Sequence, residues 1–186
     1  MEEREYIDNF EQRLDSLLAG IYGSDGQLMI VDELEERWQE GAPEYMISAV
    51  AEINHYPAFT LAVPAYVGMA MALWWDKNWD AYKERTYADL LKRGGGFDTI
   101  DEYILEHVLG IRPDSKEREE LEAQVRAMAH TVMSAIQHED IEHQTTRAFY
   151  VLARAAKVMF RAGVTLRLKS LGYHYEKGQI PTPQVN

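Results

Sequence analysis

Glutamate and histidine recur at helical spacing in two distant segments of the chain. Glu139 and His143 are four residues apart, and Glu52 and His55 are three residues apart. Residues three or four apart lie on the same face of a helix, so both members of a pair can reach one ion. Carboxylates and imidazoles from several helices are the ligands that bind divalent Fe, Mn or Zn in helical bundles. These four residues are therefore the candidate first ligands of a divalent metal ion.

Three further residues are candidate ligands because of where helical spacing places them. An apolar stripe along the C-terminal part of the chain consists of Leu121, Val125, Met128, Val132 and Ile136. If the helix continues, the stripe reaches Glu139, Glu142 and His143 where core side chains are expected. A buried charge must be paired or bound to a metal ion. His107 is expected to point toward the core, and His130 lies on the long helix itself.

The opposite interpretation depends on a helix break near His138. Such a break would place positions 139–143 in a solvated turn, and the carboxylates and imidazoles would then need no metal ion. Glu-rich helices also generate Glu-x-x-His by chance, and a histidine on an apolar face is more often hydrogen-bonded than metal-bound. The sequence leaves both interpretations open.

The spacing resembles parts of two families of helical metalloproteins. Glu52 and His55 are similar to one Glu-x-x-His pair of the ferritin-like di-iron proteins, whereas the second pair would be Asp140 and His143, with Asp in place of Glu. His55 and His143 are also similar to the early and late histidines of the DinB-like four-helix proteins, although Glu139 stands where a second late histidine belongs. Either resemblance covers a few residues and implies a metal-dependent hydrolase or oxidoreductase.

Basic residues concentrate near the C-terminus of an otherwise acidic chain. The net charge is −12, yet seven of the 19 basic residues and one of the 31 acidic residues lie within 144–186. Arg147, Arg154 and Arg161 recur every seven residues, with Lys157 on the adjacent row, which forms a cationic stripe on one helix face. The stripe is expected to bind a small anionic ligand or an acidic partner, or to pair with the acidic segment 32–36. A net charge of −12 argues against nucleic acid as a partner.

Other classes of function find no support in the residue types. Cysteine is absent, which excludes disulfides, zinc–thiolate centres and cysteine nucleophiles and fits a cytoplasmic protein. No serine lies in a nucleophile-elbow pattern. Positions 58–75 carry no charge and approach the length of a membrane span, but Pro64, Gly68 and many alanines favour a buried central helix over a membrane helix. We therefore expect no membrane partner.

The elements that position these residues are all helical. Apolar residues recur at three-and-four spacing almost throughout, with no alternating run typical of a strand. The pattern predicts an all-α bundle of about seven to eight helices, in which a buried helix at about 57–75 packs against long C-terminal helices. Predicted helices cover about 3–18, 27–39, 43–55, 57–75, a short stretch ending at 93, 99–109 and 113–171. We expect one domain over 1–172 and a polar tail over 173–186.

Two classes of function remain after these exclusions. A non-catalytic helical binding or assembly module is the leading hypothesis, because no catalytic motif stands out. Trp74, Trp75 and Trp79 are expected at a homodimer interface or around an aromatic pocket. The alternative hypothesis is the metal-binding helical bundle described above.

Overall fold

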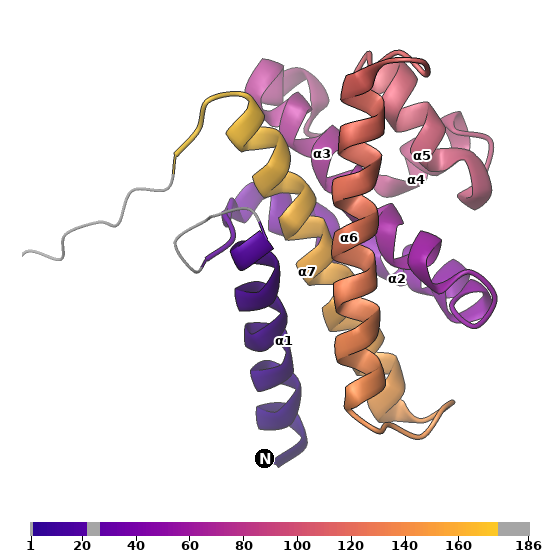
Figure 1. Cartoon of the computed structure of the whole chain (residues 1–186). Coiled ribbons are helices and arrows are strands. Elements are labelled where there is room, and N and C mark those ends of the chain that lie inside the picture. Colours follow the sequence, from indigo (N-terminus) through magenta and orange to yellow (C-terminus); the bar gives the residue numbers. More distant parts are fainter. Residues whose placement is uncertain (1, 22–26, 175–186) are drawn as a thin grey trace, which may run out of the picture.

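The computed structural model describes residues 2–21 and 27–174, and across these ranges it contains seven α-helices and no strand (Figure 1). This confirms the all-α bundle expected from the sequence. The helices are α1 (Glu2–Ile21), α2 (Asp32–Glu52), α3 (Pro57–Tyr82), α4 (Tyr87–Arg93), α5 (Ile100–Tyr103), α6 (Lys116–His138) and α7 (Thr146–Ser170). A 3₁₀ turn, η1 (Phe97–Thr99), precedes α5, and a π-helical turn, η2 (Ile104–Val108), follows it. Most of the expected polar tail, 175–186, lies outside the described residues.

Helix α3 is the centre of the bundle, as the uncharged segment 58–75 predicts. It lies behind α6 and α7 in Figure 1 and packs against both, as well as against α2. By length and composition it is long and apolar enough to cross a membrane, yet 78% of its most apolar 18-residue window is buried by the other helices. A helix that is apolar on every side must be covered on every side. Its burial fits the core helix of a soluble protein.

Helices α3 and α7 approach each other closely where small residues meet. A Cβ added at Gly163 of α7 would lie 2.6 Å from the carbonyl carbon and 2.8 Å from the Cα of Ala65, and its nearest neighbour would be the Ala65 carbonyl oxygen. A Cβ added at Gly68 of α3 would meet the backbone of Phe160 and Val164. The small residues Ala65 and Gly163 therefore allow the two backbones to come close together.

Helix α2 corrects one expected boundary. The sequence predicts two helices separated at Gly41 and Pro43, but one helix runs through both residues. A Cβ added at Gly41 would lie 2.6 Å from the Cβ of Tyr87, so glycine here makes room for α4 and does not end a helix. Pro43 is the twelfth residue of this 21-residue helix and does not break it.

The connection between α6 and α7 decides between the two interpretations of the C-terminal segment. Helix α6 ends at His138, which confirms the predicted break. The alternative prediction of a continuous helix is wrong. Asp140 and Gln144 take left-handed backbone conformations, with φ of 48° and 63°. Thr145 then caps α7 by accepting a hydrogen bond from the Ala148 amide at 3.1 Å. The stripe of α6 therefore does not extend to positions 139–143.

Candidate functional site

Glu139 faces α1 and not the core of the bundle. The Tyr6 hydroxyl donates a 2.6 Å hydrogen bond to Glu139 Oε2, and Arg13 forms an ion pair with the other oxygen. The Glu139 side chain is 11% exposed. Burial and this hydrogen bond together raise the pKa of Tyr6 to about 12. Glu139 therefore has two partners on α1, and the prediction that it continues the core stripe of α6 is wrong.

The other predicted ligands are spread over the surface. The exposed residues among them are His55, His107, His130, Glu142 and His143, while Glu52 is half-buried near the end of α2. The exposure of His107 contradicts its expected orientation toward the core. Within 2–21 and 27–174, no group of three or more His, Asp or Glu side chains is arranged to hold a metal ion. The Fe, Mn or Zn centre stays a prediction from the sequence.

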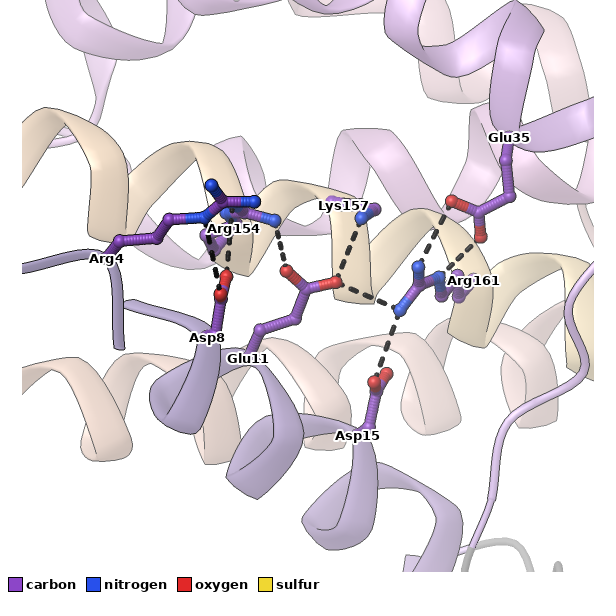
Figure 2. Close-up of polar contacts among 8 residues, drawn as sticks. All are labelled: Arg4, Asp8, Glu11, Asp15, Glu35, Arg154, Lys157 and Arg161. Carbon is purple, nitrogen blue, oxygen red and sulfur yellow. Dashed lines mark hydrogen bonds and ion pairs between the residues drawn. The ribbon is translucent and has the colours of Figure 1, made fainter. Parts of the chain in front are cut away.

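The cationic stripe of α7 pairs with carboxylates of the same chain (Figure 2). Arg161 binds Glu35 of α2 through two guanidinium nitrogens. Its third guanidinium nitrogen, Nη1, donates to Glu11 at 3.0 Å and to Asp15 at 3.2 Å on α1. At the far end of the helix, Arg147 forms a bidentate ion pair with Glu3. The acidic segment 32–36 thus contributes one partner, Glu35, and α1 supplies most of the others.

Glu11 lies at the centre of this network. Its carboxylate accepts contacts from Arg154 at 2.5 Å, Lys157 at 3.0 Å and Arg161 at 3.0 Å (Figure 2). Burial alone would raise the pKa of Glu11, but the hydrogen bond from Lys157 and the three positive charges hold it below its usual value. Because α1 supplies carboxylates for each of these three cations, the network fastens α1 to α7.

Asp15 differs from Glu11 although it belongs to the same network. It contacts Arg161, yet its Oδ1 is buried with no hydrogen-bond partner among the described residues. Burial has the largest effect and raises the pKa of Asp15 to about 6, while the charges of Arg161 and Lys157 lower it and the carboxylates of Glu11 and Glu35 raise it. Asp15 is therefore the carboxylate of the network that most readily takes up a proton.

An apolar pocket of about 710 Å³ opens where α2, α3, α6 and α7 meet near the α6–α7 connection. Apolar side chains line most of it, including Leu61 of α3, Met133 of α6 and Leu152 of α7. The polar side chains lie mainly on the α6–α7 connection, among them His143 and Gln144. We call this cavity the apolar pocket.

Two large apolar side chains at the pocket are exposed to solvent. Val50 of α2 is 51% exposed and Phe149 of α7 is 44% exposed, and both line the cavity. Ile47, one turn before Val50, is 76% exposed. Both strained residues of the connection, Asp140 and Gln144, also line it. Left-handed backbone at non-glycine residues is uncommon and concentrates at functional sites.

Sequence reasoning named His143 but missed the pocket around it. Its walls come from four helices, and the lining residues are spread over the sequence from Val50 to Leu152, so no local motif marks the cavity. The available signal was the apolar Ile47 and Val50 on a helix whose other face already supplies core residues such as Met46 and Ala49.

The tryptophans at the end of α3 make contacts within the chain. Trp74 is 7% exposed and stacks on Tyr82, with ring centroids 5.7 Å apart. Trp75 is half-buried and its ring contacts Tyr173, whose hydroxyl donates a 2.7 Å hydrogen bond to Asp76. Trp79 is half-buried as well. The homodimer stays a prediction, and sedimentation at several concentrations tests it.

Fold and cavities thus define an all-α bundle with an apolar pocket. Comparison of the chain with protein-family models, with curated proteins and with solved structures gives no match.

Proposed function

We propose that this protein is a helical binding module whose apolar pocket takes a small, uncharged molecule with an apolar body. The observation that carries the proposal is the pocket itself: a cavity of about 710 Å³ with mainly apolar walls that opens to solvent beside exposed Val50 and Phe149. Ligand cavities in proteins commonly have volumes of roughly 300–1,000 Å³ and a few polar groups that orient the ligand.

The distribution of polar groups in the pocket favours one ligand chemistry. Of the described residues that line it, none is Lys or Arg, and Asp140 and His143 are its charged or chargeable groups. A ligand with a full charge would find no fixed opposite charge of matching strength. The amides of Asn54, Gln137 and Gln144 offer both donors and acceptors. A hydroxyl, amide or carbonyl at one end of an otherwise apolar ligand suits this arrangement.

The cavity is also better suited to binding a small molecule than to catalysing its conversion. The titratable groups that line it, Asp140 and His143, are both exposed, whereas catalytic groups commonly lie in clefts beside a specific charged partner. We therefore propose binding without chemical conversion. We place the module in the cytoplasm, which fits a chain without cysteine.

Fluorescence titration with the neutral apolar probe N-phenyl-1-naphthylamine tests the proposal. Ala148 lines the cavity from the first turn of α7, so Ala148→Phe should fill part of it and weaken probe binding at least tenfold. Val50→Asp, at a half-exposed position, should weaken binding without removing core packing. Ala127→Phe is the matched control, because Ala127 is an exposed alanine of α6 that does not line the cavity.

Circular dichroism on each variant shows that the helices are intact. Unchanged probe affinity in both Ala148→Phe and Val50→Asp would contradict the proposal, as would an equal loss of affinity in Ala127→Phe.

A further inference from the structure

A second, smaller pocket, which is polar and basic where the first is apolar, lies where the end of α3 meets η2. Its volume is about 170 Å³, and its lining includes three basic side chains, Lys77, Arg85 and His107. Three aromatic side chains, Trp74, Tyr82 and Tyr103, also line it. No carboxylate is among the lining residues, although the protein carries a net charge of −12. We call this cavity the basic pocket.

Two irregularities of the backbone meet at the basic pocket. Asn78 interrupts α3 with non-helical backbone angles (φ −168°, ψ 86°), and its side-chain oxygen accepts a hydrogen bond from the Ala81 amide at 3.2 Å. This break lies between Lys77 and Tyr82, which both line the cavity. The last turn of α3 and the residues that follow it therefore bring Tyr82 and Arg85 to the same cavity as Trp74.

The second irregularity, the π-helical turn η2, explains the position of His107. Regular helical spacing from Ile100 and Ile104 predicts His107 on the core face, whereas the structure exposes it at the basic pocket. The Leu109 amide donates to the Ile104 carbonyl at 2.8 Å, an i to i+5 bond that adds one residue to the turn. Single π turns occur frequently at functional sites.

The basic side chains of this pocket differ from those of the cationic stripe on α7. Arg154, Lys157 and Arg161 each have carboxylate partners within the chain. Over residues 2–21 and 27–174, neither Lys77 nor Arg85 forms an ion pair with a carboxylate. Two cations left unpaired in one cavity of an acidic protein favour an anion from outside the chain.

Arg85 is held in place by aromatic rings and keeps hydrogen-bond donors available. Its guanidinium carbon lies 5.4 Å from the ring centroid of Tyr82 and 5.8 Å from that of Trp74. The two rings are stacked nearly parallel, at an interplanar angle of 5°. A guanidinium group that stacks on aromatic faces still presents its N–H donors at the edge, in the fork that fits phosphate or carboxylate oxygens.

We propose that the basic pocket binds a phosphate group, either as free phosphate or as a small phosphate monoester. Arg85 supplies the forked donors, Lys77 supplies a mobile positive charge, and His107 supplies a ring nitrogen from the opposite element. The volume equals that of roughly five or six water molecules in the liquid, which suits a tetrahedral oxyanion and is too small for a larger organic ligand. The site is independent of the apolar pocket, which is lined by other residues.

Isothermal titration calorimetry of the full-length protein with inorganic phosphate, at constant ionic strength, tests the proposal. We expect saturable binding with a Kd near or below about 1 mM. Arg85→Gln should weaken binding at least tenfold, and Lys77→Gln and His107→Gln should each weaken it severalfold. Lys83→Gln is the matched control: Lys83 follows α3 directly, pairs with Asp80 at 3.2 Å and does not line the pocket, so its variant should bind within twofold of the wild type.

Lys77 and His107 are exposed, so their variants keep the test valid if Arg85→Gln alters the fold. Phenyl phosphate and acetate are titrated in parallel. Tighter binding of phenyl phosphate would assign the site to a monoester, and tighter binding of inorganic phosphate would assign it to the free ion. Absence of saturable phosphate binding, equal binding of acetate, or an equal loss in Lys83→Gln would overturn the proposal.

Discussion

Replacing Gly163 with alanine tests the close approach of α3 and α7. The added Cβ would lie 2.6 Å from the carbonyl carbon of Ala65, whereas ordinary van der Waals contact begins at 3.4 Å. The atoms in the way belong to the backbone, and the Ala65 carbonyl oxygen lies nearer still, so the two helices must move apart by more than the 0.8 Å between these two distances. Overpacking costs roughly 1–3 kcal/mol, and we take the upper end because the obstructing atoms are backbone; alanine regains about 1 kcal/mol of helix propensity. We expect Gly163→Ala to lower the free energy of unfolding by about 2 kcal/mol, which lowers Tm by roughly 4–8 °C at this chain length.

Urea denaturation followed by circular dichroism measures this change, and Gly20→Ala provides the control. Gly20 lies in α1, and a Cβ added there would meet nothing within 4 Å. The control should leave stability unchanged or raise it by up to about 1 kcal/mol. The two variants carry the same substitution in the same kind of element, so opposite signs isolate the helix contact. A Gly163→Ala protein as stable as the wild type would refute the reasoning.

Three further predictions concern the polar contacts of α1. Tyr6→Phe removes the hydrogen bond to Glu139 and should lower the free energy of unfolding by about 1–2 kcal/mol in urea at neutral pH, and a change below about 0.5 kcal/mol would contradict it. Glu11→Gln removes the carboxylate that Arg154, Lys157 and Arg161 share and should lower the free energy of unfolding by about 3 kcal/mol at pH 7. An unchanged free energy of unfolding at that pH would show that the network does not stabilise the fold. Asp15→Asn should instead raise the free energy of unfolding. The pKa of Asp15 is about 6 in the folded protein against 3.8 for a free side chain, so the wild type loses stability as the pH rises from about 4 to 6. The variant has no carboxyl group at this position and does not lose this contribution. The stability difference between Asp15→Asn and the wild type should therefore grow in favour of the variant over that range of pH, and a difference independent of pH would exclude the assignment.

Much of the fold could be predicted because the signals are local. The uncharged segment 58–75 identified the core helix, although α3 extends beyond it to Tyr82, with a kink at Asn78. The start of α6, expected near 113, also depends on a local signal, since the Ser115 side chain accepts a hydrogen bond from the Arg118 amide at 3.1 Å. The continuity of α2 through Gly41 was not predictable from the local sequence, because that glycine makes room for Tyr87, 46 positions later.

The site was harder to predict because it depends on where helices end. Glu139 lies on the core stripe if α6 continues, but the helix ends one residue earlier, and the side chain turns to Tyr6 on α1 instead. His107 was misplaced by a single π turn, which has no recognisable sequence signature. The cationic stripe on α7 was visible in the sequence, whereas its main partner, α1, was not, because 143 positions separate Arg154 from Glu11.

The contact between α3 and α7 has a consequence for the order of folding. Ala65 and Gly163 are almost a hundred positions apart, and the ion pairs of Glu11 join the first helix to the last. Helical proteins usually fold fast because their contacts are local, and closing a long loop before any contact forms slows the process. During synthesis, the apolar α3 leaves the ribosome long before the helix that covers it. The chain thus depends on its last described helix to complete the core, and a nascent chain that stops before α7 exposes the most apolar surface of the protein.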